Sequence, residues 1–104
     1  MKLYHATKID NKEAILEFGL FTNESDKISN DVRLDGEYVF GFNNLESAIN
    51  FIEDNCEPCY IVFSFNVSDS DAIKDTEYVD ADGDAYAVPF NISANMLTIE
   101  IEEY

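Results

Sequence analysis

Basic residues are scarce in this sequence. Its 104 residues include six Lys and Arg against 22 Asp and Glu, which gives a formal net charge of -16 at pH 7. Nucleic acids and anionic membranes attract proteins through neutralised phosphates, so this balance argues against direct binding to either. The carboxylates are spread from Asp10 to Glu103. They act either as a solubility device or as a surface that imitates a nucleic acid and binds a basic protein.

Long apolar runs are missing as well. No stretch is long enough to span a membrane, and the first residues lack the apolar segment of a secretory signal. We therefore expect a cytoplasmic protein with no membrane partner. With 46% hydrophobic and 13% aromatic residues, the chain is too apolar for a disordered protein. Its length suits a single domain over residues 1–104.

Cysteine and histidine are too few for a metal site of the usual kind. The two cysteines form one C-x-x-C pair, Cys56 and Cys59, and His5 is the single histidine. A zinc site needs two further ligands, which one distant histidine does not supply. A redox pair belongs at the start of a helix, whereas this pair follows a predicted helix beside Asp54 and Glu57, whose charges discourage a thiolate. We interpret the spacing as chance and predict no metal site.

Hydrophobic periodicity predicts an α+β domain of short strands with two helices. The clearest helix runs from residue 43 to about 54, because Leu45, Ala48, Ile49 and Ile52 follow the i, i+3, i+4, i+7 spacing of a core-facing stripe. Alternation of apolar and polar residues predicts the strands. The second helix and five strands are expected at 11–18, 2–7, 37–42, 59–67, 85–90 and 97–101.

Local signals set the ends of these elements. Asp10 with Glu13, and Asn43 with Glu46, have the spacing of a capping box at a helix start, and Gly19 can close the first helix. Residues 22–34 are polar and carry few periodic apolar positions. We expect a long loop or lid there.

Four segments follow one another in an informative order. LYHATK at 3–8 is followed by AILEFGL, then by GEYVFGFNNLESAINFI and a long apolar strand. This order resembles the ADP-ribosyltransferase superfamily, whose small members begin with a Y-H-G-T strand, a short helix ending in Gly-Leu and a G-x-Y strand that leads into a helix. The likeness covers most of the chain. It is nearest to the branch with a His, Tyr and acidic triad, shared by diphtheria-like toxins, poly-ADP-ribose polymerases and small phage-encoded modifiers, and it implies their compact fold.

The resemblance implies a site for NAD. His5 matches the family histidine that binds the adenosine ribose, and Thr7 matches the neighbouring hydroxyl of that strand. Tyr38 matches the aromatic that stacks on the cationic nicotinamide ring, and Phe40 is assigned to the same site. Taken without the resemblance, His5 and Phe40 are core residues and Tyr38 is a cross-strand aromatic.

The acidic member of the triad is expected in the segment VDADGDAYAVP. Asp80, Asp82 and Asp84 are the candidates, and we favour Asp80 because it ends an extended segment. The carboxylate would stabilise the oxocarbenium-like charge that develops as the glycosidic bond breaks. The alternatives are a solvated Asp-Gly turn and a calcium loop, although the run lacks the order of an EF-hand.

Two features of the sequence depart from what such a site needs. Ala6 stands where the family usually has Gly, which lets the backbone approach the dinucleotide. The net charge opposes the anionic pyrophosphate of NAD, so Arg33, Lys2 and Lys8 are its candidate neutralisers.

The resemblance therefore implies an NAD-dependent mono-ADP-ribosyltransferase that modifies a protein partner, such as a host protein targeted by a phage or mobile-element effector. A basic or nucleic-acid-binding acceptor is expected, because it would dock on an acidic surface. The alternative is a non-enzymatic inhibitor that mimics a nucleic acid, occupies a basic protein and needs no NAD pocket.

Overall fold

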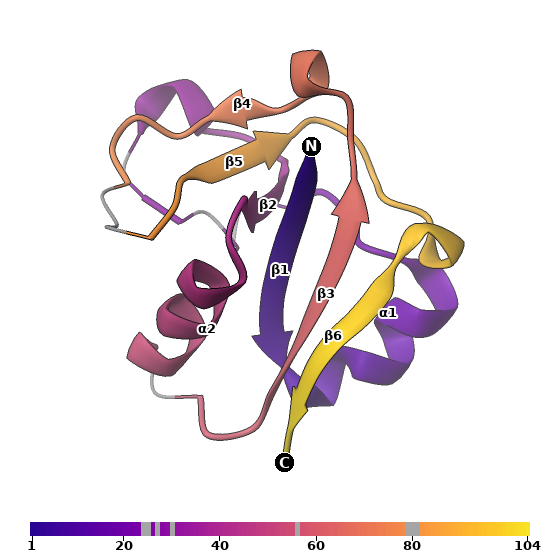
Figure 1. Cartoon of the computed structure of the whole chain (residues 1–104). Coiled ribbons are helices and arrows are strands. Elements are labelled where there is room, and N and C mark those ends of the chain that lie inside the picture. Colours follow the sequence, from indigo (N-terminus) through magenta and orange to yellow (C-terminus); the bar gives the residue numbers. More distant parts are fainter. Residues whose placement is uncertain (24–25, 27, 30, 56, 79–81) are drawn as a thin grey trace.

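The computed structural model places one antiparallel sheet at the centre of the molecule, with a helix on each face (Figure 1). It describes residues 1–23, 26, 28–29, 31–55, 57–78 and 82–104. This arrangement confirms the predicted α+β class with short antiparallel strands and two helices. No helix within the described residues is both long and apolar enough to cross a membrane.

Six strands form the sheet in the order β4-β5-β2-β1-β3-β6. The first strand of the chain is therefore central, and the edges are β4 and β6. The strands are β1 (Lys2–Lys8), β2 (Val39–Phe42), β3 (Tyr60–Asn66), β4 (Ile73–Lys74), β5 (Ala85–Val88) and β6 (Thr98–Glu103). The α-helices are α1 (Lys12–Phe18) and α2 (Leu45–Asp54), and short 3-10 turns lie at Ile9–Asn11, Val32–Leu34, Asp69–Asp71 and Ala94–Met96.

Alternation along the strands divides the core between the two faces of the sheet. On one face, Leu3 and Phe65 are opposite each other in β1 and β3 and belong to a cluster that Ile15 of α1 covers. On the other face, Val62 of β3 packs in a cluster with Ile52 of α2. Each helix therefore buries its apolar side against one face of the same sheet.

The backbone pairing of β1 differs sharply between its two sides. Toward β3 it runs without interruption from Lys2 opposite Asn66 to Lys8 opposite Tyr60. Toward β2 the register holds a single pair, Tyr4 opposite Phe42. The ladder between β1 and β2 therefore ends after one pair, and the rest of β1 has no paired neighbour on that side among the described residues.

Most predicted elements are confirmed, with shifts of one or two residues at their ends. The strand expected at 85–90 ends at Val88, just before Pro89, which has no backbone N–H to donate to a ladder. The two-residue strand β4 was not predicted from the sequence.

The helix starts differ from the predicted capping pairs. Asn44, rather than Asn43, caps α2 by accepting a hydrogen bond from the backbone N–H of Ser47 at 3.2 Å. The side chain of Asn43 is engaged elsewhere, because it accepts a 2.8 Å hydrogen bond from the backbone of Asp84. A 3-10 turn precedes α1, and Asn11 at its N-terminus makes no capping hydrogen bond through its side chain.

Gly19 closes α1 as the sequence predicts, and the structure shows why only glycine fits. Its φ is 86°, and a Cβ there would lie 2.1 Å from the carbonyl oxygen of Ile92. Gly36 also has a positive φ, 123°, but a Cβ there would meet only the Tyr38 ring at 3.7 Å.

We predict that Gly19→Ala destabilises the protein more than Gly36→Ala. Both variants carry the backbone strain of an alanine at positive φ, of order 1–3 kcal/mol. Only Gly19→Ala adds a clash with backbone, worth about 1–3 kcal/mol more. Urea unfolding of the two variants and wild type measures the difference, and equal losses would show that the contact at Ile92 does not restrict this position.

Candidate functional site

His5 closes the gap that opens between β1 and β2. Its side chain is buried, and its Nδ1 lies 2.7 Å from the carbonyl oxygen of Phe40 on β2. A carbonyl oxygen only accepts, so Nδ1 carries a proton in this arrangement. The side chain thus replaces a missing rung of the ladder, and the second ring nitrogen, Nε2, is left for another partner.

Two cavities meet at His5 in the part of the chain that the structure describes. The first has a volume of about 310 Å³ and the second about 250 Å³, and His5, Thr7 and Asp26 line both. Ligand pockets usually measure about 300–1,000 Å³, so the first cavity is at the lower end of this range and the second falls below it. Their shared wall makes them a candidate site for a ligand with two parts.

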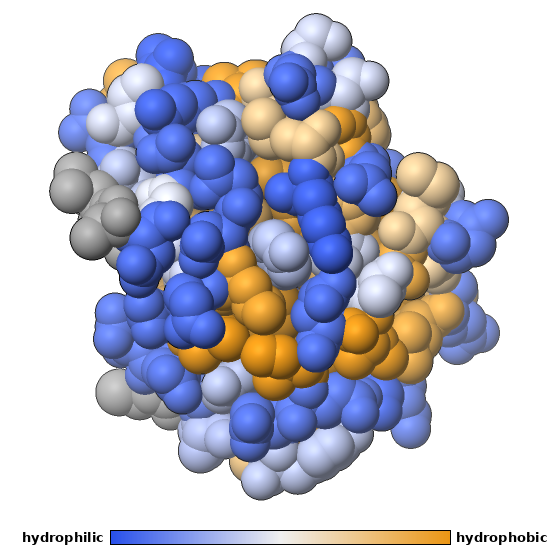
Figure 2. Space-filling model, in the orientation of Figure 1, coloured by the Kyte–Doolittle hydropathy of each residue, from blue (hydrophilic) through white to orange (hydrophobic). Residues whose placement is uncertain are grey.

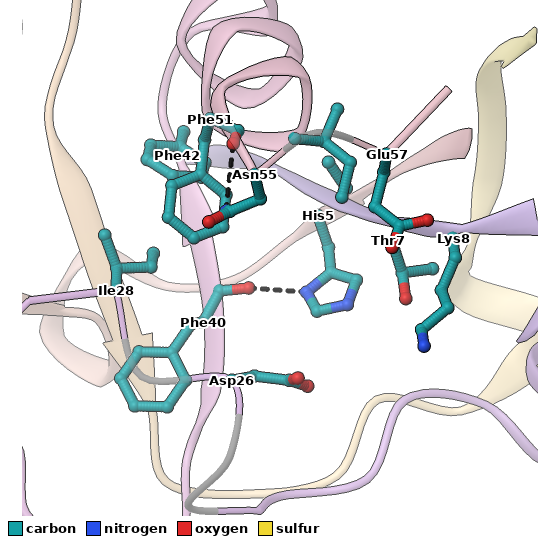
Figure 3. A pocket seen from close by; sticks show the side chains of 12 residues that line it. His5, Thr7, Lys8, Asp26, Ile28, Phe40, Phe42, Phe51, Asn55 and Glu57 are labelled. Atoms are coloured by element: carbon teal, nitrogen blue, oxygen red, sulfur yellow. Dashed lines mark hydrogen bonds between the residues drawn. The ribbon is translucent and has the colours of Figure 1, made fainter. Parts of the chain in front are cut away.

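The first cavity lies between the end of β1, β2 and the end of α2. Its apolar wall consists of Phe40 and Phe42 of β2, Phe51 and Ile52 of α2, and Ile28. Phe42 and Phe51 are neighbours, with ring centroids 5.3 Å apart. Figure 3 shows the His5 ring between the Phe40 carbonyl on one side and Thr7 and Lys8 on the other.

The second cavity lies over the face of the sheet that α1 covers. Its lining includes Asn11, Ile15 and Val39, together with Phe18 and Phe21, two aromatic side chains that are 60% and 58% exposed. Asn11 donates a 2.8 Å hydrogen bond to the Thr7 hydroxyl. The hydroxyl proton of Thr7 therefore remains available for a ligand.

Two carboxylates line the cavities although the sequence did not predict them as site residues. Asp26 is exposed and lines both cavities, where its carboxylate accepts a 2.8 Å hydrogen bond from the Asn23 amide. Glu57 lines the first cavity, and its backbone N–H bonds to the carbonyl of Ile52 at the end of α2. Both bring negative charge to a site that was expected to bind an anionic dinucleotide.

The predicted aromatic residues lie next to the first cavity in different ways. Phe40 lines it directly and is 2% exposed. Tyr38 is half-buried and lines neither cavity, because its ring packs edge-on against Phe40 at 5.9 Å, within a cluster that includes Leu34. Its backbone pairs with Asn23 instead of with β1.

The described residues of the predicted acidic run come just before β5, where Asp84 lies beside Asn43 at the N-terminus of α2. Asp80 falls outside the described residues, and Asp82 is exposed. Asp84 accepts a backbone hydrogen bond of 3.0 Å from Asn43, and its carboxylate is 3.6 Å from the Lys74 ammonium. Neither Asp82 nor Asp84 lines the two cavities at His5.

The predicted lid, residues 22–34, is anchored at its C-terminal end by a buried aspartate. Asp31 accepts hydrogen bonds from the Arg33 side chain, at 2.7 and 3.1 Å, and from the backbone and hydroxyl of Thr76, both at 3.1 Å. Arg33 also donates to the carbonyl of Lys74 on the edge strand β4. The one arginine of the chain is thus used to fix the loop and is not one of the residues that line the cavities at His5.

A second buried aspartate strengthens the same anchor. Asp75 is 2% exposed, and both its carboxylate oxygens accept from the Ser29 hydroxyl, at 2.6 and 2.7 Å. It also accepts from the backbone N–H groups of Glu77 and Tyr78. Asp31 and Asp75 together tie the loop to the segment that follows β4.

Sequence reasoning missed several cavity residues because each carries a weak signal. Glu57 was seen only as part of the C-x-x-C spacing, of which Cys56 lies outside the described residues. Phe51 and Asn55 lie near the end of α2, and the hydrophobic pattern of this helix indicates packing against the core but no ligand site. Among the described residues, no group of three or more His, Cys, Asp or Glu side chains could hold a metal ion.

We predict that nitrogen NMR of the His5 ring detects the proton on Nδ1. The bond to the Phe40 carbonyl requires it in every charge state of the ring. Long-range proton–nitrogen correlation spectra distinguish the two tautomers of a neutral ring. A neutral ring protonated only on Nε2 would show that the bridge between β1 and β2 does not form.

We also predict that Asp31 makes the stability of the fold acid-sensitive. Hydrogen bonds from Arg33 hold the pKa of the Asp31 carboxyl well below its usual 3.8, despite its burial. A lowered pKa contributes stability above the unfolded-state value, and this contribution is lost as pH falls from there toward the folded-state value.

Urea unfolding between about pH 7 and pH 2 tests this assignment. Asp31→Asn should be less stable than wild type at neutral pH and should lose less stability on acidification. Asp71→Asn, at an exposed position outside the network, is the control. If the free energy of unfolding of Asp31→Asn and of wild type fell equally on acidification, the role of Asp31 would be contradicted.

Comparison with known proteins supplies no relative. The chain matches no protein-family model, no curated protein and no solved structure.

Proposed function

We propose that this protein binds NAD across the two cavities at His5 and transfers ADP-ribose to a side chain of a protein partner. The supporting observation is the position of His5, a buried histidine with one nitrogen bonded to Phe40, at the junction of two cavities. NAD consists of two nucleotides, and each of them can occupy one of the two adjoining cavities in this proposal.

The residues at the cavities suit different parts of this substrate. The Nε2 atom of His5 can bind a ribose hydroxyl, because Nδ1 is already bonded. The aromatic wall of Phe40, Phe42 and Phe51 can receive the cationic nicotinamide ring, with Tyr38 packed against Phe40. In this proposal Tyr38 acts on nicotinamide either directly, after a movement of its ring, or by supporting Phe40.

The carboxylate of the reaction is the least defined part of the proposal. Transfer breaks the bond between nicotinamide and C1′ of its ribose, and a negative charge close by stabilises the cation that develops. Asp80, Asp82 and Asp84 remain the candidates from the sequence. Asp26 and Glu57 join them, because they line the cavities.

The acidic surface supports a basic protein as the acceptor, including a host protein if the chain is a phage or mobile-element effector. Figure 2 shows hydrophilic side chains around much of one face, with a band of hydrophobic side chains across its middle. Exposed carboxylates occur on both helices, such as Glu13 and Glu17 of α1 and Glu46 and Glu53 of α2. Such a surface attracts a positively charged partner over the screening length of about 8–10 Å.

The same surface supports a second candidate function, the non-enzymatic inhibitor. In that case exposed carboxylates occupy the nucleic-acid site of a basic protein, and the cavities at His5 are incidental. The two proposals separate on one result. An inhibitor still binds its partner when His5 is replaced, and it needs no NAD. A transferase with His5 replaced forms less ADP-ribosylated product.

We predict that NAD raises the melting temperature of the protein. A ligand at ten times its Kd that binds only the folded state adds about 1.4 kcal/mol, or roughly 6–10 °C for a domain of this size. His5→Ala should reduce the shift, measured from the melting temperature of the variant itself, because the ribose loses its partner. His5→Gln, a polar replacement, provides a second variant if His5→Ala fails to fold.

The reaction itself is tested by mass spectrometry of basic candidate partners after incubation with NAD, looking for an added ADP-ribose. Asn or Gln variants of the five candidate carboxylates should show one residue whose loss lowers transfer by roughly 100-fold or more, about 3 kcal/mol. Absence of NAD binding and of transfer would refute the transferase proposal. Retention of the partner by His5→Ala would then favour the inhibitor.

A further inference from the structure

Among the described residues, four of the five Lys and Arg side chains are paired with carboxylates. Lys27 falls outside the described residues. The other five are Lys2, Lys12, Arg33, Lys74 and Lys8, and the first four form ion pairs with Glu100, Glu102, Asp31 and Asp84 respectively. Among the described residues, Lys8 pairs with no carboxylate.

The isolation of Lys8 is unexpected in a chain that carries 22 Asp and Glu. Lys8 is the last residue of β1, where its backbone pairs with Tyr60 of β3. Glu57 lines the same cavity, yet the two side chains form no ion pair in the described structure. The backbone of Lys8 is therefore held by the sheet, while its exposed ammonium remains available to a ligand.

Lys8 lies close to two other polar groups at the cavity. His5, Ala6, Thr7 and Lys8 line the first cavity from consecutive positions near the end of β1. In Figure 3, Lys8 and Thr7 lie on the side of the His5 ring that faces away from Phe40. The Thr7 hydroxyl accepts a hydrogen bond from Asn11, so its proton can be donated to an anion.

We propose that Lys8 and Thr7 bind the phosphate groups of a nucleotide in the first cavity. Lys8 is the one Lys or Arg among the described residues that line this cavity, so it supplies positive charge there, and Thr7 supplies a directed hydrogen bond. The assignment deepens the proposed function and rests on it, because the ligand is a nucleotide diphosphate such as the one within NAD. Lys8 here is a binding residue for phosphate and takes no part in bond breaking.

The rim of the cavity explains why one lysine matters. Asp26 and Glu57 repel an anion, and the whole chain has a net charge of -16. A phosphate can enter only where a local cation offsets this field. Removal of Lys8 should therefore affect charged ligands strongly and uncharged ligands hardly at all.

NMR titrations with ADP, adenosine and inorganic pyrophosphate test the proposal on the full chain. Wild type should bind ADP more tightly than adenosine. Lys8→Gln should weaken ADP binding by roughly tenfold, the typical value of one charged hydrogen bond, and leave adenosine binding unchanged. Lys8→Arg should recover most of the loss, and Glu57→Gln should tighten ADP binding.

Lys2→Gln is the matched control, because it also removes one positive charge from β1 but lies at the far end of the strand, paired with Glu100. Equal losses in Lys8→Gln and Lys2→Gln would overturn the proposal, since the effect would then be one of net charge. So would a wild type that binds ADP no better than adenosine, or that binds neither.

These outcomes can be separated from failure of the transferase proposal. ADP binding that depends on Lys8, without transfer from NAD, would leave the phosphate site standing and refute the transferase. Transfer from NAD that is unchanged in Lys8→Gln would support the transferase and refute the phosphate site.

Discussion

The hydrogen bond between the His5 ring and the Phe40 carbonyl is the interaction on which the site depends. The backbone pairing between β1 and β2 stops after Tyr4 and Phe42. Beyond that pair, the His5 side chain joins the two strands through its hydrogen bond to the Phe40 carbonyl. This bond holds the imidazole in one orientation, leaves one nitrogen for another partner and separates two cavities. A buried carbonyl without this partner would cost about 1–3 kcal/mol, so the bridge serves the fold as well as the site.

Three of the basic side chains connect elements that are distant in sequence. Lys2 of β1 reaches Glu100 of β6, and Lys12 at the start of α1 reaches Glu102 of the same strand. Arg33 connects the loop before β2 to the edge strand β4. Exposed ion pairs of this kind contribute little individually, typically below about 1 kcal/mol. Their wider effect is to leave the carboxylates of the helices in excess, and so to keep the outer surface negative.

The sequence predicts the elements of the fold better than the site because the two depend on different information. Periodicity identifies β1, β3 and α2, since burial on one face imposes a repeat that local residues record. The strand β4 escapes prediction because two residues, held by pairing with β5, carry no repeat. The burial of Asp31 escapes it for another reason. Its partner Thr76 is 45 residues away in the sequence. Without that contact, an aspartate in a polar loop is expected to be exposed to solvent.

The pairing of the central strand has a consequence for how the chain folds during synthesis. β1 is translated before β3, and its long ladder requires β3, with Lys2 opposite Asn66. The intervening loop must close before any of these contacts form, which is slow compared with local helix formation. The growing chain therefore exposes Leu3 of β1 until β3 has left the ribosome, and the excess of carboxylates over basic residues opposes self-association during that interval.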